Sequence, residues 1–109
     1  MVDKNVVNAV QAYLRAVQKK GVPVSYGVLF GSYARSQQHA WSDIDLLVVS
    51  PRYDRTWTQK DWAKLWRIAA STDVRIEPIP VGERQYKEDD SSLIIEVARR
   101  EGQIIPLAE

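Results

Sequence analysis

Two pairs of residues in the first half of the chain suit phosphate and metal chemistry. Gly31 and Ser32 follow an apolar run, where a glycine turn can direct backbone N–H groups and a hydroxyl toward phosphate oxygens. Asp43 and Asp45 open a second apolar run ten residues later. Their carboxylates point to one face of a strand, and such a pair favours a compensating cation. Because Mg²⁺ is usually held by one or two carboxylates together with substrate phosphates, the spacing predicts a phosphate-binding turn beside a magnesium site.

These two pairs meet only if the apolar runs beside them are neighbouring strands that run in opposite directions. We expect the first strand at residues 24–30, ending at Gly31, and the second at residues 43–49, beginning at the aspartates. The second run is almost wholly apolar after Asp45. Strands covered on both faces have this composition, so we expect the second strand at the centre of the sheet.

A third strand is expected at residues 73–81, where polar and apolar residues alternate. The alternation assigns Val74 to the buried face of this strand. Pro78 and Pro80 both lack an N–H donor on the same side, so one flank of the strand is expected to be unpaired.

The third strand also offers a third carboxylate. Two-metal phosphoryl transfer generally uses more than two acidic ligands, and Asp73 and Glu77 lie on one face of the strand. Asp73 stands at the start of the strand, where acids often only cap or face solvent. The direction of the side chain therefore favours Glu77, with Asp73 as the alternative.

Apolar residues at spacings of three and four predict amphipathic helices around these strands. We expect helices at residues 3–19, 59–70 and from 91 or 92 to 101, with a short one at 32–37. Residues 52–57 and 82–90 are expected to be loops, and residues 103–106 a short last strand. The side chains expected to face inward from the last two long helices are Trp62, Leu65, Trp66 and Ala69, and Leu93, Ile94, Val97 and Ala98. The expected fold is α/β, a small mixed sheet of about three to four strands with helices packed on it.

Composition limits the classes of protein to which the chain can belong. Its 109 residues suit a single domain, residues 1–109, with one core. The net charge is only +1 and no basic stripe is evident in the sequence, so direct binding of nucleic acid is not expected. There is no cysteine, no signal-peptide pattern and no apolar run of membrane-spanning length. We therefore expect a soluble, cytoplasmic protein that could form homo-oligomers.

The motif formed by Gly31-Ser32, ten residues, and Asp43-x-Asp45 resembles the signature of the nucleotidyltransferase superfamily that includes DNA polymerase β. The greatest resemblance is to the minimal nucleotidyltransferase (MNT) proteins of prokaryotes. It covers residues 24–81 by motif, and residues 75–80 are similar to the strand that carries the third catalytic acid. The chain departs from the family by having Ser36 in place of a common glycine, and a glutamate rather than an aspartate as the third acid.

The resemblance implies a reaction in which a nucleoside monophosphate, AMP from ATP, is moved onto a hydroxyl with two Mg²⁺ ions. It implies that Asp43, Asp45 and Glu77 are metal ligands and catalytic residues, with Glu77 activating the acceptor. The phosphates would be held by Ser32 and the Gly31 turn.

In the same family pattern, Arg35 is expected to assist in binding the triphosphate. MNT proteins commonly pair with a helical HEPN protein, and some are antitoxins that adenylylate a tyrosine of a HEPN toxin. Such a partner is therefore expected here. The alternative is a catalytically silent MNT protein that neutralises or scaffolds a partner by contact alone.

Overall fold

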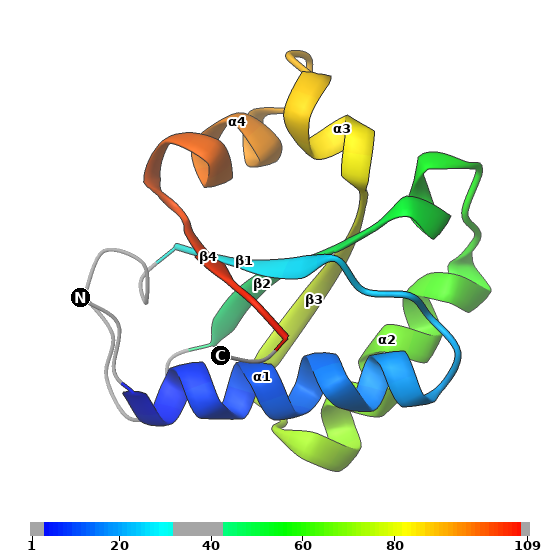
Figure 1. Ribbon diagram of the computed structural model, residues 1–109, viewed down its shortest axis with the longest axis vertical. Coiled ribbons are helices and arrows are strands. Elements are labelled where there is room, and N and C mark those ends of the chain that lie inside the picture. The colour runs from blue at the N-terminus through cyan, green and yellow to red at the C-terminus, as the bar shows by residue number, and fades with distance from the viewer. Residues whose placement is uncertain (1–3, 32–42, 108–109) are drawn as a thin grey trace.

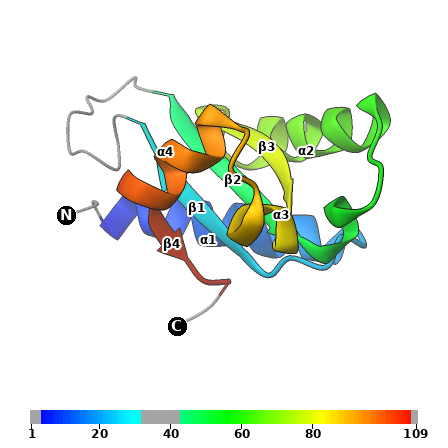
Figure 2. The ribbon, with the colours of Figure 1, turned by 90° about the horizontal axis from the view of Figure 1, so that it is seen from above.

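The computed structural model describes residues 4–31 and 43–107, which form a four-stranded sheet between two layers of helices (Figures 1 and 2). The elements are α1 (Lys4–Lys19), β1 (Tyr26–Phe30), β2 (Ile44–Ser50), the 3-10 helix η1 (Pro51–Asp54), α2 (Gln59–Thr72), β3 (Ile76–Gly82), α3 (Glu83–Glu88), α4 (Leu93–Glu101) and β4 (Gln103–Ile105). None of these helices is long and apolar enough to cross a membrane. Predictions that fall on residues 1–3, 32–42 and 108–109, including the short helix at 32–37, lie outside the described residues.

The strand order is β3-β2-β1-β4. β1 is antiparallel to both β2 and β4, whereas β2 and β3 are parallel. The predicted mixed α/β sheet, the antiparallel pairing of the first two strands and the short last strand are therefore confirmed. β2 lies inside the sheet, as its apolar composition predicted.

The two faces of the sheet carry separate cores. Ile44, Leu46 and Val48 of β2 face α1 and α2, while Leu47 and Val49 face α3 and α4. This alternation follows from the two-residue period of a strand, and it explains why almost every position of β2 is apolar. Figure 1 shows α1 and α2 on one side of the sheet and α3 and α4 on the other.

Local signals fix the ends of the long helices. The side chains of Thr58 and Asp61 form a capping box at the start of α2. After α1, Gly21 has a φ of 96°, a backbone conformation that glycine adopts without strain. The buried hydroxyl of Tyr13 donates a hydrogen bond to the carbonyl oxygen of Leu65 at 2.9 Å, which joins α1 to α2.

Two segments predicted as loops contain helices. η1 lies in the first of them and buries Tyr53, and α3 occupies most of the second and buries Tyr86. The start of α3 is capped from outside: the backbone N–H groups of Arg84 and Gln85 donate to the carboxylate of Asp54. The prediction failed here because the stabilising acid is about thirty residues away in the sequence, where no local pattern reveals it.

The predicted inward faces of α2 and α4 were partly wrong. Leu65, Ala69 and Ala98 are buried as expected, but Ile68 and Ile95 take the other core positions. The side chains left outside are Trp62 (43% exposed), Trp66 (37%), Leu93 (73%) and Ile94 (48%). Periodicity gave the helices correctly, but in a short helix several adjacent apolar residues allow more than one face to be chosen.

The third strand begins later than predicted. β3 starts at Ile76, because Asp73 still caps α2 through a hydrogen bond from its N–H to the carbonyl oxygen of Ala69. Val74, expected to be buried, lies in the connection and is 79% exposed. The prediction of an unpaired flank is confirmed: β3 is an edge strand, and it contains Pro78 and Pro80.

Candidate functional site

The end of the sheet at which β1 stops and β2 starts gathers the acidic residues. Asp45 pairs in register with Phe30 on the antiparallel strand β1 and with Glu77 on the parallel strand β3. Residues in register on neighbouring strands share a face, so the carboxylates of Asp45 and Glu77 lie on the same side of the sheet. Asp43, two residues before Asp45, also belongs to this side and is exposed.

Gly31 closes this end of β1 and lies against the aspartate pair. Its φ is 76°, in the left-handed region that side chains disfavour. A Cβ atom at this position would also collide with Oδ2 of Asp45. Glycine is therefore required twice, once by the backbone and once by the carboxylate beside it.

The pKa values show that this end of the sheet has an excess of negative charge. Burial, and to a smaller extent the charge of Asp43, raises the pKa of Asp45 above its ordinary value. The pKa of Glu77 is raised to about 7, first by a hydrogen bond with Asp43, then by burial and the negative charges of Asp43 and Asp45. We refer to Asp43, Asp45 and Glu77 as the acid cluster.

Asp73 does not belong to the acid cluster. Its Oδ1 accepts hydrogen bonds from the backbone N–H and from Nε of Arg75, and its Oδ2 lies 2.8 Å from a guanidinium nitrogen of the same residue. These contacts with Arg75 hold the pKa of the Asp73 carboxyl below its ordinary value. Of the two candidates for the third carboxylate, the structure brings Glu77 to the aspartate pair and directs Asp73 into the turn before β3.

The donor set of the acid cluster suits a hard divalent cation, because it offers carboxylate oxygens and carries uncompensated negative charge. Among the described residues, no three such side chains are already disposed around one metal position. Instead, Glu77 shares a hydrogen bond with Asp43. The proton in this hydrogen bond partly relieves the repulsion between the carboxylates, as a bound cation would. The residues of the acid cluster therefore fit Mg²⁺ by chemistry and charge.

The remaining predicted site residues are only partly described. Gly31 is placed beside Asp45, whereas Ser32 and Arg35 lie outside the described residues. The sequence predicted that the Gly31 turn lies beside the aspartate pair, but not that Gly31 contacts Asp45 in particular, because this depends on the register between β1 and β2. No signal in the sequence alone reveals that contact.

A family model described as a nucleotidyltransferase domain matches residues 10–104 of the chain. Its range includes every residue of the acid cluster. A search of curated proteins gave no significant match.

Solved structures share the fold at low sequence identity. A protein from Sulfolobus solfataricus described as a nucleotidyltransferase has a TM-score of 0.65 and 16% identity over 90% of this chain and 77% of its own. A toxin–antitoxin structure with AMP-PNP has a TM-score of 0.61 and 20% identity over 87% of this chain and 71% of its own. A mutant of the toxin–antitoxin MntA-HpeT has a TM-score of 0.59 and 17% identity over 86% of this chain and 69% of its own. At these identities the likeness shows the fold.

Proposed function

Since the chain belongs to the nucleotidyltransferase domain family, we propose that it transfers a nucleoside monophosphate, AMP from ATP, to a hydroxyl group of an acceptor. In this reaction the acceptor oxygen forms a bond to the α-phosphorus, the bond from that phosphorus to the bridging oxygen breaks, and pyrophosphate leaves. The proton of the acceptor hydroxyl goes to a base of the protein.

The acid cluster is the observation that carries the proposal. Asp43 and Asp45 would hold Mg²⁺, with Glu77 completing the set, as two-metal phosphoryl transfer requires. Bound Mg²⁺ supplies charge neutralisation for the phosphates and for the oxygens between which the phosphoryl group moves. Glu77 is also suited to accept the acceptor's proton, because a general base works best with a pKa near the working pH and that of Glu77 is about 7.

The triphosphate would lie at the end of β1. The positive φ of Gly31 turns the chain there without a side chain, which leaves the backbone open to a close ligand. We assign Ser32 to the β- and γ-phosphates and Arg35 to an additional charge-assisted contact. These two roles follow from the family motif.

Two of the related structures support the choice of nucleotide and metal ligands. One toxin–antitoxin structure was solved with AMP-PNP, an ATP analogue. The MntA-HpeT structure is a mutant in which two aspartates two positions apart are replaced by glutamate. Asp43 and Asp45 have the same spacing, which agrees with a role for this pair in the chemistry.

The same relatives support a protein partner. They are toxin–antitoxin complexes, and we propose that the acceptor hydroxyl belongs to a helical HEPN-type toxin that this chain adenylylates as the antitoxin. The cytoplasmic location stays a prediction. A second candidate function is a silent MNT protein that acts on such a partner by binding alone. The observation in its favour is Glu77, a longer acid than the usual aspartate that shares a hydrogen bond with Asp43.

Calorimetry with ATP tests the site. ATP should bind in the presence of Mg²⁺ or Mn²⁺, and the binding should disappear in the Asp43→Asn/Asp45→Asn variant. Asp73→Asn is the matched control: it removes a carboxylate charge near the start of β3 but keeps the Oδ1 acceptor that bonds the N–H and Nε of Arg75 and holds the turn, so metal-dependent ATP binding should persist. Equal ATP affinity with and without metal would contradict the proposed site.

Transfer of labelled AMP separates the two candidate functions. The wild type should label its partner, whereas Glu77→Gln should lower the rate by about 10²–10⁴-fold, the usual contribution of a general base. If the wild type binds its partner normally but transfers no label, the silent binding protein is the correct reading.

A further inference from the structure

Three tryptophans lie exposed at the start and along the side of α2. Trp57 precedes the helix and is 39% exposed, and Trp62 and Trp66 are one turn apart within it. The rings of Trp62 and Trp66 pack edge to face, with centroids 5.6 Å apart and an angle of 63° between their planes. We call Trp57, Trp62 and Trp66 the tryptophan surface. Exposed aromatic patches mark interaction sites, and tryptophan is enriched among residues that dominate binding energy.

The tryptophan surface lies on the flank of α2 that points away from α1. Lys64 marks the opposite flank, because its Nζ donates a hydrogen bond to the carbonyl oxygen of Lys20 just after α1, at 2.7 Å. At 100° per residue, Trp62 and Trp66 lie on the side of the helix opposite Lys64. β3 is the edge strand next to β2, and it carries Glu77. Glu77 itself shares the face of the sheet that α3 and α4 cover, so a molecule on the tryptophan surface would lie on the opposite face from the acid cluster.

Prolines restrict how a partner can approach this edge. Pro78 and Pro80 remove two backbone donors from β3, which already pairs with β2 on its inner side. Addition of a further strand needs those donors, so neither a second copy nor a peptide can extend the sheet here in the ordinary way. Contacts would be made by side chains, as between packed helices.

The charges beside Trp57 favour an acidic partner. Arg52, Arg55 and Trp57 line a pocket of about 200 Å³ together with Thr56 and Asp61. Asp61 lies 3.4 Å from a guanidinium nitrogen of Arg52, whereas Arg55 forms no ion pair with any residue that the structure describes. A guanidinium and an indole together suit a carboxylate inserted from a partner.

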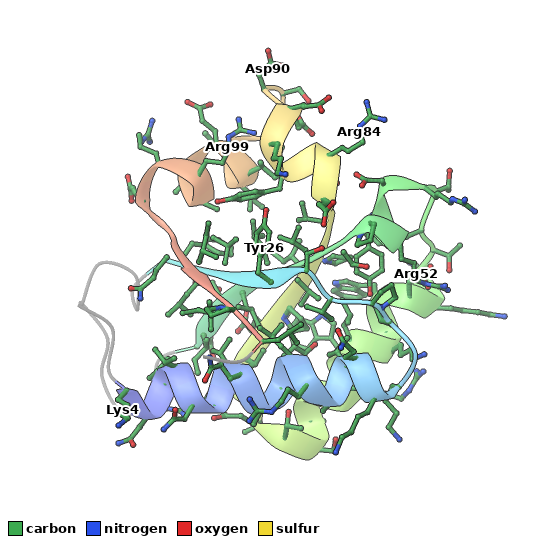
Figure 3. All side chains as sticks on the ribbon, in the orientation of Figure 1. Lys4, Tyr26, Arg52, Arg84, Asp90 and Arg99 are labelled. Atoms are coloured by element: carbon green, nitrogen blue, oxygen red, sulfur yellow. The ribbon has the colours of Figure 1, made fainter. Side chains whose placement is uncertain are left out.

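Two other occupants fit less well. Single-stranded nucleic acid stacks its bases on free aromatic faces, but Trp62 and Trp66 pack edge to face against each other. A second copy offers an apolar surface, formed by the exposed Leu93 and Ile94 of α4, with the acidic residue Asp90 close by in the sequence. Helix α4 lies across the sheet from α2 (Figures 1 and 3), so copies joined in this way would extend as an open chain.

We propose that the tryptophan surface and the Arg52–Arg55 pocket bind a different protein, through a helix with an apolar face bordered by acidic side chains. The inference goes beyond the proposed function, because this docking surface and the acid cluster lie on opposite faces of the sheet. It assigns the docking contacts to α2 and the chemistry to the acid cluster, so the two are separable by mutation.

The probe is a stapled amphipathic helix with leucine on one face and glutamate beside it, compared with the same peptide carrying lysine at each glutamate. Nuclear magnetic resonance follows the indole N–H signals of the four tryptophans. The glutamate peptide should shift the signals of Trp57, Trp62 and Trp66. The lysine peptide should have an affinity at least about tenfold lower, which is the scale of a lost interfacial charge contact.

Variants locate the contact. Trp62→Ala/Trp66→Ala should lower the affinity for the glutamate peptide about tenfold or more, as expected for residues that dominate an interface. The matched control, Leu93→Ala/Ile94→Ala on the opposite layer, should leave it unchanged. Thermal unfolding checks that both variants fold, and metal-dependent ATP binding should be normal in both. A loss of peptide binding with normal ATP binding would separate this inference from the proposed function.

Several results would overturn the inference. They are equal binding of the two peptides, no indole shifts with the glutamate peptide, or full affinity in Trp62→Ala/Trp66→Ala. A single-stranded oligouridylate that shifts the same indole signals would assign the surface to nucleic acid instead. Self-association in sedimentation that Leu93→Ala/Ile94→Ala abolishes would assign it to a second copy.

Discussion

Lowering the pH from 8 to 6 should weaken the binding of a divalent cation to the acid cluster. The pKa of Glu77 is about 7, so its carboxyl is mostly ionised at pH 8 and mostly protonated at pH 6. A protonated carboxyl bound to Asp43 is a poor metal ligand, because the proton and the cation compete for the same oxygens. Affinity should therefore be highest above pH 7 and fall as the pH drops through that value.

The size of the effect follows from the pKa. One unit below it, about nine in ten Glu77 carboxyls hold a proton, which lowers the apparent affinity about tenfold between pH 8 and pH 6. A glutamate with its ordinary pKa of 4.5 would change the affinity by only about a few per cent over the same range. The raised pKa thus predicts a dependence that an unperturbed acid would not show.

Titration with Mn²⁺ in the absence of ATP measures the effect, because a terminal phosphate itself titrates near pH 6. Calorimetry in two buffers of different ionisation enthalpy should also detect close to one proton released per protein at pH 6, and about a tenth of that at pH 8.

Glu77→Gln is the control for this titration. It should bind Mn²⁺ more weakly but with nearly the same affinity at both values of pH. The variant keeps His39, the single histidine of the chain, so any contribution of that imidazole is subtracted. A flat profile for the wild type, or an equally steep one for Glu77→Gln, would refute the assignment of the proton to Glu77.

Two further predictions concern the end of β1 and the loop after it. Gly31→Ala should lose both stability and metal-dependent ATP binding. Gly21→Ala also has a positive φ but no atom within 4 Å of the added Cβ, so it should lose only about 1–2 kcal/mol of stability. Chemical denaturation and calorimetry measure the two effects, and equal behaviour of the variants would show that the contact with Asp45 is unimportant. Arg35→Ala should weaken ATP binding by ~1.5–3 kcal/mol but leave transfer detectable at saturating ATP. Complete loss of transfer in a folded Arg35→Ala protein would rank this arginine with the aspartates.

The sequence was sufficient to predict the features that repeat along the chain or belong to a motif. The almost wholly apolar composition of β2 gave its central position, and the helical period gave α1 and α2. The motif spacing brought Asp43 and Asp45 to the same end of the sheet as Gly31, because the connected strands are antiparallel. These features depend on neighbours in the sequence.

Features that depend on distant residues were not predicted. The start of α3 is capped by Asp54 from η1, and Ile68 rather than Trp62 packs into the core because the position of the sheet, and not the helix alone, selects the buried face. Alternation places Asp73 and Glu77 on the same face, so the sequence favoured Glu77 but kept Asp73 as the alternative. Only the hydrogen bonds from Arg75 show that Asp73 belongs to the turn.

Those same bonds give Asp73 a part in positioning the acid cluster. The contacts between Asp73 and Arg75 hold the turn before β3, and the carbonyl oxygen of Arg75 accepts a hydrogen bond from the N–H of Ile44 at 2.7 Å. This bond aligns the start of β2 with the start of β3, which sets the register that pairs Asp45 with Glu77. A slip of one residue would turn Glu77 to the face that packs on α1 and α2, where a carboxylate has no place. The acid cluster therefore depends on a fourth acid outside it, one that acts through the backbone rather than on the substrate.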